Sequence, residues 1–286
     1  MGGLVREGAR RFRLARLVFG HGSTNARDEA AYLTLHALGL PLDAAARTFE
    51  RQVAPLDARR ALDLFQRRIR ERRPAAYLTR EAWLGGFRFF VDERVVVPRS
   101  HIAELLRAHL APWISTRNSV KTALDLCTGS GCLAILLANS FPRAKIVASD
   151  ISRPALAVAR RNVREYGLGR RIRIVESDLF ARLGGKRYDL IVCNPPYVTA
   201  SSMQRLPREY RYEPRAALAG GKDGLAIVRR VLESALRYLS PSGLLVVEVG
   251  GARKALEKAY PRLPFTWLDT SGGGDVFLLT RGQLEA

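Results

Sequence analysis

The chain has 286 residues, of which 47% are hydrophobic and 26% are charged. This length suits one large α/β domain and a smaller one, and the composition is ordinary for a globular protein. No apolar stretch approaches the roughly 20 residues that a membrane-spanning helix needs, so we predict no membrane protein.

The charge balance is strongly basic, with 47 Lys and Arg against 27 Asp and Glu and a formal net charge of +20. A field of this sign favours polyanions such as RNA or a ribosomal particle. Nearly all of the excess is arginine, because lysine occurs only at positions 121, 145, 186, 222, 254 and 258. A GC-rich coding bias would produce the same skew without RNA contact, so the composition leaves both explanations open.

The first 20 residues carry arginines throughout, but no uninterrupted apolar core and no small-residue cleavage site. We therefore predict no signal peptide and a cytoplasmic protein, with a mitochondrial presequence, against which Glu7 argues, as the alternative. Cysteine and histidine are few and scattered: Cys127, Cys132, Cys193, His21, His36, His101 and His109. Because neither set has the spacing of a zinc site or a metal-binding helix, we predict reduced thiols and no metal ion.

Residues 1–73 have the pattern of a small domain of short amphipathic helices. Polar caps and helix-breaking prolines divide the segment into three predicted helices, from Thr24 or Asn25 to about Leu38, from Asp43 to Pro55, and from Asp57 to about Arg72.

Residues 74–118 are predicted to link this domain to a larger one. The residue pattern indicates a β-hairpin with strands Phe87–Val91 and Arg94–Val97. Ser100 can cap a following helix, His101–Leu110, and the polar stretch Ser115–Ser119 ends the linker.

Residues 119–286 alternate strands and helices, as a doubly wound parallel α/β sheet requires. Seven strands are predicted, at Thr122–Leu126, Lys145–Ser149, Arg171–Glu176, Tyr188–Cys193, Gly243–Val249, Phe265–Asp269 and Asp275–Leu279. Helices are predicted between them, notably at Cys132–Asn139, Arg153–Tyr166 and Asp223–Leu239. The last two strands are so close that we expect a terminal antiparallel hairpin.

Three of these strands end in residues that suit a nucleoside ligand. The loop Asp125–Gly131 opens a helix, and its glycines let the backbone approach a ligand closely. Asp150 can accept both hydroxyls of a ribose, and the neighbouring Ile151 can pack on adenine. Asp178 can bond the adenine amino group while Leu179 covers the other face of the ring. Either aspartate can instead cap the following helix, so these roles are hypotheses.

Asn194-Pro195-Pro196-Tyr197 follows the apolar run Tyr188–Cys193 and so lies at the carboxyl end of a buried strand, where open α/β sheets bind ligands. Two prolines in series forbid a helix and leave rigid carbonyl groups. The Asn194 side-chain oxygen and the Pro195 carbonyl can form two fixed acceptors beside the Tyr197 ring, which suits a planar NH2 group. A plain Pro-Pro turn is the alternative. Further along, Glu213–Leu218 is either a lid over the substrate or an ordinary surface loop.

Taken in order, these motifs resemble the S-adenosylmethionine-dependent methyltransferases with a seven-stranded Rossmann-like sheet. More narrowly, the chain is similar to the protein-(glutamine-N5) methyltransferases. The family motif matches Asn194–Tyr197 without change, and the cofactor loop matches Asp125–Gly131, except that Cys127 stands where glycine is more usual. The resemblance also covers the helical N-terminal part and the hairpin, so nearly the whole chain.

The resemblance implies that S-adenosylmethionine is the cofactor and that residues 1–73 recognise the substrate. The implied cofactor-binding residues are Asp125, Cys127, Thr128, Gly129, Ser130, Gly131, Asp150, Ile151, Asp178, Leu179 and Asn194. Catalysis would depend on Asn194, Pro195 and Tyr197, and the substrate would contact these residues and Pro196. No metal is implied.

Within the family, the stretches Pro74–Trp83 and Val97–Ser100 look most like the branch acting on large-subunit ribosomal protein L3. That substrate would be met within an RNA-containing assembly intermediate. The release-factor branch, which more often has Pro-Arg-Pro-Glu-Thr at the second stretch, is one alternative. The others are methylation of an exocyclic amino group in RNA or DNA, and a non-catalytic RNA-binding assembly protein.

Overall fold

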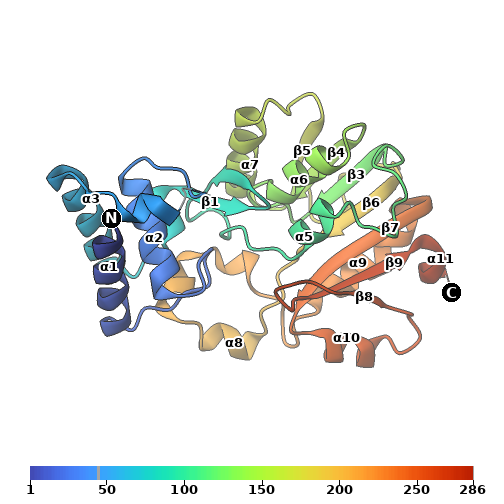
Figure 1. The fold of residues 1–286 in the computed structure, drawn as a ribbon. Helices are drawn as coiled ribbons and strands as arrows, with labels where there is room; N and C mark the ends of the chain where they lie inside the picture. Colours follow the sequence, from blue (N-terminus) through green and yellow to red (C-terminus); the bar gives the residue numbers. More distant parts are fainter. Residues whose placement is uncertain (44–45, 286) are drawn as a thin grey trace. The chain divides into compact units, whose positions relative to one another are not determined.

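The computed structural model describes residues 1–43 and 46–285. The chain forms two compact units (Figure 1). The helical unit contains Met1–Ala82, Val91–Glu93 and Leu206–Tyr212, and the sheet unit contains Trp83–Phe90, Arg94–Arg205 and Glu213–Ala286. The predicted division at residues 73 and 118 and the recognition role of the first part stay predictions.

The helical unit packs its helices around a small apolar core. Its elements are α1 (Gly2–Leu14), α2 (Ala26–Ala37), η1 (Ala46–Glu50), α3 (Pro55–Glu71), α4 (Ala75–Thr79) and η2 (Arg208–Tyr212). Phe12 and Phe65 are fully buried and meet edge to face, with ring centroids 5.4 Å apart. A Cβ on Gly8 would lie 2.7 Å from the Phe65 ring, so only glycine allows this approach of α1 to α3.

A buried ion cluster joins distant parts of the helical unit. Arg68 of α3 is fully buried and donates from Nε to the Glu29 carboxylate of α2 at 2.7 Å. Burial raises the pKa of Glu29, and the adjacent Arg68 guanidinium opposes that shift. Glu209, from the segment Leu206–Tyr212, accepts from Arg72 Nε at 3.0 Å and from the Val18 N–H at 3.1 Å. These bonds incorporate a segment from the second half of the chain into the helical unit.

The predictions for the first helices are partly confirmed. Asn25 caps α2 as expected, since its side chain accepts from the N–H groups of Arg27 and Asp28. The start predicted for α3 is wrong: the helix begins at Pro55, because proline lacks an N–H and its fixed φ suits the first helical position. Asp57 lies in the first turn instead of capping the helix. The helix predicted from Asp43 falls partly on residues 44–45, outside the described residues.

A hairpin is present, but only one of its two predicted strands, Phe87–Val91, is confirmed. It is formed by β1 (Glu81–Leu84) and β2 (Phe87–Phe90). Gly85 and Gly86 both have positive φ, as a two-residue hairpin turn requires, so they form the turn and Arg94–Val97 is not a strand. The following helix α5 (Ile102–Arg107) is shorter than predicted, because the chain turns into left-handed conformations at His109 and Leu110.

The sheet unit contains the seven-stranded sheet that was predicted. Its strands are β3 (Thr122–Leu126), β4 (Lys145–Asp150), β5 (Ile172–Glu176), β6 (Tyr188–Cys193), β7 (Leu239–Gly250), β8 (Thr266–Leu268) and β9 (Asp275–Thr280). Their order is β5-β4-β3-β6-β7-β9-β8. The first five are parallel, and β9 runs antiparallel to both neighbours, which confirms the terminal hairpin.

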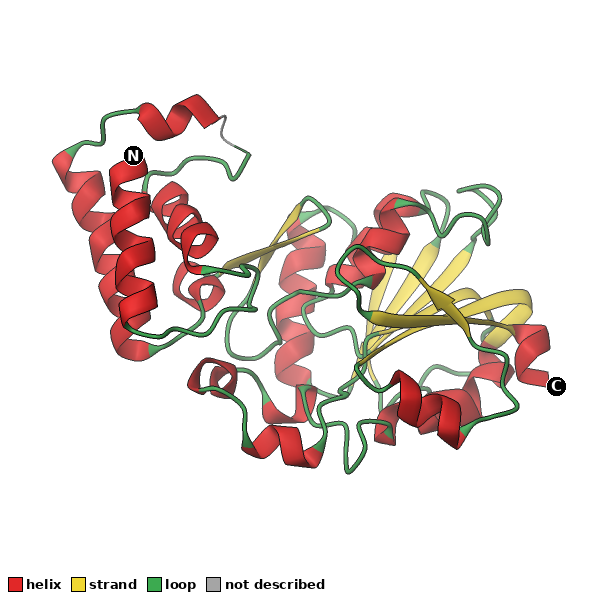
Figure 2. Ribbon diagram, turned by 60° about the horizontal axis from the view of Figure 1, so that its bottom comes forward, coloured by secondary structure: helices red, strands yellow, loops and turns green. Residues whose placement is uncertain are grey.

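Helices cover both faces of this sheet (Figure 2). The remaining helices of the sheet unit are α6 (Cys132–Ser140), α7 (Arg153–Glu165), α8 (Ala200–Gln204), η3 (Arg215–Ala217), α9 (Ala226–Tyr238), α10 (Arg253–Ala259) and α11 (Arg281–Glu285). Leu124 and Leu126 of β3 pack in one core with α9, whereas Asp125 between them bonds to α6. Because successive strand residues point to opposite faces, α6 and α9 lie on opposite sides of the sheet.

Candidate active site

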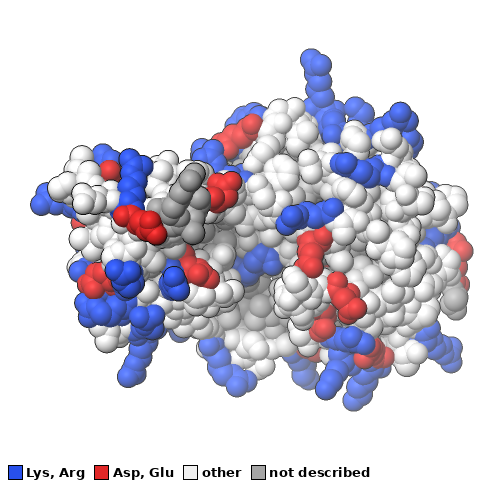
Figure 3. Space-filling model, in the orientation of Figure 1, with Lys and Arg blue, Asp and Glu red and all other residues white. Residues whose placement is uncertain are grey.

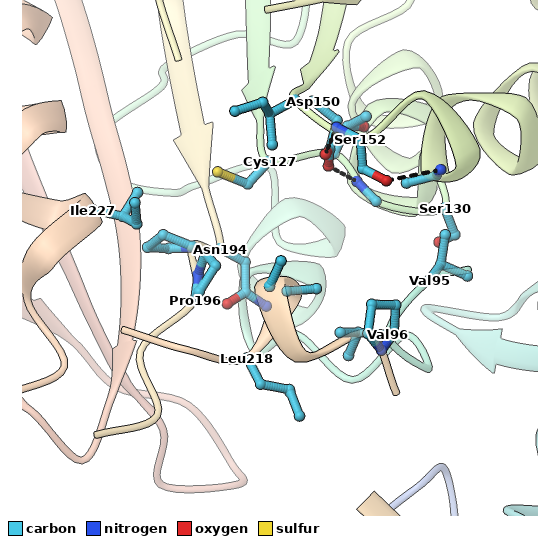
Figure 4. A pocket seen from close by; sticks show the side chains of 18 of the residues that line it. Val95, Val96, Cys127, Ser130, Asp150, Ser152, Asn194, Pro196, Leu218 and Ile227 are labelled. Atoms are coloured by element: carbon cyan, nitrogen blue, oxygen red, sulfur yellow. Dashed lines mark hydrogen bonds between the residues drawn. The ribbon is translucent and has the colours of Figure 1, made fainter. Parts of the chain in front are cut away.

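A cavity of about 300 Å³ lies in the sheet unit at the carboxyl ends of β3, β4, β5 and β6. This is the edge at which open α/β sheets bind ligands. Most of the predicted site residues line it: Cys127, Thr128, Gly129, Ser130, Asp150, Ile151, Asp178, Leu179, Asn194, Pro195, Pro196 and Tyr197 (Figure 4). Asp125 and Gly131 lie behind this lining.

Asp125 stabilises the loop between β3 and α6 through hydrogen bonds on the side away from the cavity. Its carboxylate is fully buried and accepts from the Thr128 hydroxyl and from the Ala134 N–H at 3.0 Å. Burial raises the pKa of Asp125 to about 7, and these two donors oppose the shift. Gly131 has a φ of 80°, and a Cβ there would lie 3.2 Å from Ala159 of α7. Both residues therefore hold the loop in shape without facing the cavity.

Cys127 adopts a left-handed conformation, with a φ of 57°. A side chain in this conformation costs about 1–2 kcal/mol, which explains why glycine would suit the position. We expect Cys127→Gly to leave the free energy of unfolding within about 1 kcal/mol of wild type, because relief of strain offsets the greater freedom of the unfolded chain. Urea unfolding measures this, with Cys127→Ala as the control that removes the sulfur but keeps Cβ. A glycine variant less stable than the alanine variant would contradict the expectation.

Asp150 connects two turns at the cavity. Its carboxylate accepts from the N–H groups of Gly129 and Ser152, each at 2.9 Å (Figure 4). Burial raises the pKa of Asp150, and these two donors oppose the rise. The residue that caps α7 is Ser152, whose hydroxyl accepts from Ala155, so the simple capping alternative for Asp150 is wrong. Ile151 is 65% exposed beside it and offers the cavity a large apolar side chain.

Asp178 and Leu179 follow β5, and no helix is assigned between β5 and β6 among the described residues. The capping alternative for Asp178 is therefore wrong. Its carboxylate lies at the surface and accepts from Arg230 Nη2 of α9 at 2.8 Å. Leu179 has a φ of 47° and is largely buried, so it presents only a small part of its surface to the cavity.

The Asn194–Tyr197 turn leaves β6 at the other end of the cavity, where Figure 4 shows the Asn194 side chain near Pro196 and Leu218. The Tyr197 ring packs so closely on Gly250 that a Cβ there would lie 2.6 Å from it. The Tyr197 hydroxyl donates to the buried carboxylate of Glu248 at 3.4 Å. Burial raises the pKa of Tyr197, and the Glu248 carboxylate adds to the effect. Gly250 and Glu248 therefore fix the position of the Tyr197 side chain.

Sequence reasoning missed two further parts of the cavity lining. One is Arg94–Ser100, which the sequence pattern placed in a strand and a turn, and the other is Ile227 and Arg230 from α9. Pro214 and Ala216–Leu218 also line the cavity, so Glu213–Leu218 is not an ordinary surface loop. No periodicity marks Arg94–Ser100 as a ligand wall, because its position depends on partners more than 100 residues away.

The lining fits an adenosine-containing ligand. Asp150 presents a carboxylate and Ile151 an apolar surface at one end, and the buried Ser149 hydroxyl has no hydrogen-bond partner within the described structure. A ribose diol and an adenine ring match this pairing of carboxylate and apolar side chains. Among the described residues, no group of three or more His, Cys, Asp or Glu side chains could hold a metal ion.

Comparison with known proteins places these features in a family. Residues 103–207 match the Methyltransferase small domain. The chain is 54% identical over 283 residues to the ribosomal protein uL3 glutamine methyltransferase of Bordetella pertussis, covering 99% of this chain and 95% of that protein. It is also 54% identical to the protein of the same name in Neisseria meningitidis, over 282 residues that cover 98% and 93%.

A solved structure shows the same fold. It is a T. thermophilus 16S rRNA methyltransferase in complex with AdoMet and guanosine, 18% identical, with a TM-score of 0.50 over 70% of this chain and 49% of that chain. Together, the fold and the near-complete match to the curated relatives confirm the resemblance seen in the sequence motifs. The chain belongs to the family of ribosomal protein uL3 glutamine methyltransferases.

Proposed function

We propose that this enzyme methylates the side-chain amide nitrogen of a glutamine in large-subunit ribosomal protein uL3, using S-adenosylmethionine. The observation that carries the proposal is the position of Asn194–Tyr197 in the same cavity as Asp150 and the β3–α6 loop. The names of the closely similar relatives support the substrate. The place of action would be the cytoplasm, where ribosomes are assembled. No helix of the described residues is long and apolar enough to span a membrane.

The turn supplies what a weak nucleophile needs. An amide nitrogen is planar and its lone pair is delocalised, so it must be held in line with the methyl group that it attacks. The Asn194 side-chain oxygen and the Pro195 carbonyl would accept its two hydrogens and stabilise positive charge as it develops on nitrogen. Tyr197, held by Gly250 and Glu248, would confine the amide against these acceptors. Positioning would then supply much of the rate.

The cofactor residues would complete this arrangement. S-adenosylmethionine supplies an electrophilic methyl group on a sulfonium. Asp150 would accept the ribose hydroxyls, while Ile151 and Leu179 would contact the two faces of adenine and Asp178 its amino group. Cys127, Thr128, Gly129 and Ser130 would bring the β3–α6 loop to the ligand. No nucleophilic enzyme residue is needed, because the substrate amide nitrogen itself would attack the methyl group as the bond to sulfur breaks. The nitrogen would lose its proton after the transfer.

The arginines suggest where the substrate is met. Lys and Arg side chains are spread over the visible face of the molecule, with fewer Asp and Glu among them (Figure 3). On α7, Arg160 and Arg164 are exposed four residues apart, an arrangement of like charges that slightly destabilises a helix. Ribosomal proteins are basic and would be repelled in free form, so the enzyme would act on an RNA-containing assembly intermediate, with arginines on phosphate.

Transfer of radiolabelled methyl from S-adenosylmethionine tests the proposal. The substrates are purified uL3, a large-subunit precursor particle and a release factor, each digested afterwards with protease or nuclease. We expect protease-sensitive label on uL3, with more label in the precursor than in the free protein and a decline as salt rises.

The other outcomes separate the alternatives. Label on the release factor alone would assign the enzyme to the sister branch. Nuclease-sensitive label would mean that the accepting NH2 group belongs to a nucleic-acid base. No label together with no binding of S-adenosylmethionine would support a non-catalytic assembly protein. Methylation of uL3 at a rate independent of RNA and salt would refute the docking on RNA while keeping the substrate.

A further inference from the structure

We propose that Glu213 is a positioning residue for methyl transfer. Its role would be to hold the segment Glu213–Ala219, here called the cover segment, as a wall of the substrate end of the cavity. The inference rests on the proposed function, since it assigns the wall to the glutamine-binding part of that site. Pro214, Ala216, Ala217 and Leu218 of the cover segment all line the cavity.

Glu213 fixes the first end of the cover segment to Arg94–Ser100, another part of the cavity lining. Its side chain is fully buried, and the carboxylate accepts the Val97 N–H at 3.0 Å. The same carboxylate receives both terminal nitrogens of Arg99, with Nη2 at 2.7 Å from Oε2. A bidentate arginine–carboxylate contact fixes the orientation of the two side chains as well as the distance between them. Because Arg94–Ser100 also lines the cavity, this contact joins two parts of one lining.

The second end of the cover segment is fixed to Val198, which directly follows the Asn194–Tyr197 turn. Val198, the residue after Tyr197, donates its N–H to the Leu218 carbonyl at 2.8 Å and accepts from the Gly220 N–H at 2.8 Å. Val198 and Ala219 thereby form a parallel β-bridge. The cover segment is therefore held between the Val97–Arg99 wall and the Asn194–Tyr197 turn, and a shift at Glu213 would be transmitted to Leu218.

The contacts indicate which end of the cavity the cover segment serves. Figure 4 shows Leu218 on the side of Asn194 and Pro196, whereas Asp150 and Ser152 lie at the opposite end. Loss of the Glu213 contact should therefore loosen the part that confines the substrate amide and leave the nucleoside end intact. Glu213 itself does not line the cavity, and so it acts through the cover segment that it holds.

The test uses two variants. Glu213→Gln keeps the size of the side chain and one acceptor oxygen but removes the ion pair, and Arg99→Lys keeps the positive charge but removes the bidentate contact. Glu257→Gln, which breaks an exposed pair with Arg253 on α10, is the matched control. We expect KM for the protein substrate to rise roughly tenfold or more in the first two variants, with the dissociation constant of S-adenosylmethionine within about twofold. Hydrogen exchange in residues 94–100 and 213–221 should become roughly tenfold faster.

The double variant separates positioning from a general loss of structure. If Arg99 and Glu213 act through one contact, combining their substitutions should raise KM no further than the worse single variant does. If Glu213→Gln does not fold, Arg99→Lys decides by the same measurements. Exchange and KM that both match the Glu257→Gln control would overturn the proposal. Should wild type leave uL3 unlabelled, the proposed function fails, while the exchange rates still decide whether Glu213 holds the cover segment.

Discussion

Replacing Asn194 with alanine is expected to lower kcat by roughly 10²–10³-fold while leaving S-adenosylmethionine affinity nearly unchanged. The reason is that one of the two acceptors for the substrate amide is lost, and with it the stabilisation of charge that develops only during transfer. The cofactor end of the cavity, at Asp150 and Ser152, makes no hydrogen bond to the Asn194 side chain. Steady-state methyl transfer to uL3 and equilibrium binding of the cofactor measure the two effects separately.

Asn139→Ala is the matched control for this experiment, because Asn139 is an exposed asparagine on α6 outside the cavity lining. It should retain wild-type turnover. Turnover by Asn194→Ala close to that of the control would remove Asn194 from the catalytic role. Equal losses of turnover and of cofactor affinity would instead assign Asn194 to cofactor binding alone.

The second large effect is expected at Asp150. Asp150→Asn keeps the shape of the side chain but replaces one acceptor oxygen with a donor, so it cannot accept from Gly129, Ser152 and a ribose diol together. Hydrogen bonds to a charged group contribute about 1.5–3 kcal/mol, so the dissociation constant of S-adenosylmethionine should rise about 10- to 100-fold. Titration calorimetry measures this change directly.

Two further variants define the specificity of that effect. Asp178→Asn should weaken cofactor binding less, because Asp178 is exposed and already bonded to Arg230. Asp223→Asn breaks an exposed pair with Arg229 outside the cavity and should not alter binding. If Asp150→Asn bound the cofactor as tightly as Asp223→Asn does, Asp150 would serve only to join the two turns.

Much of the sheet unit could be predicted because its signals are local. Tyr188–Cys193 is a continuous apolar run, which is typical of a buried parallel strand, and its predicted bounds match β6. Asp125–Gly131, Asp150 and Asn194–Tyr197 were each expected at a strand end, and a parallel sheet brings the carboxyl ends of adjacent strands to one edge. Except for Asp125 and Gly131, which lie behind the lining, these residues meet at one cavity because of that topology.

Sequence patterns fail where two local signals are equally strong. Gly85-Gly86 and Asp92-Glu93 are both typical of turns, and the sequence pattern does not distinguish which of them closes the hairpin. A two-residue hairpin turn needs positive φ, which glycine adopts without strain, so Gly85 and Gly86 form the turn. Arg94–Val97 therefore stays outside the hairpin and lines the cavity. Proline both ends helices and favours their first turn, and at Pro55 the second property decides, because α3 begins there.

The sequence by itself determined which motifs follow the strands and in what order along the chain. These motifs are the cofactor loop, the two acidic strand ends and the Asn-Pro-Pro-Tyr turn. Each depends on residues within about ten positions of one another, whose periodicity and backbone limits act locally. Only the tertiary structure decided that Glu213 binds Arg99, 114 residues away, and that Glu248 binds Ser100, 148 residues away. Any of the 47 basic side chains could in principle pair with a given carboxylate. Packing of the whole chain selects the partner, because a buried charge is stable only where the fold places its counter-charge and donors within reach.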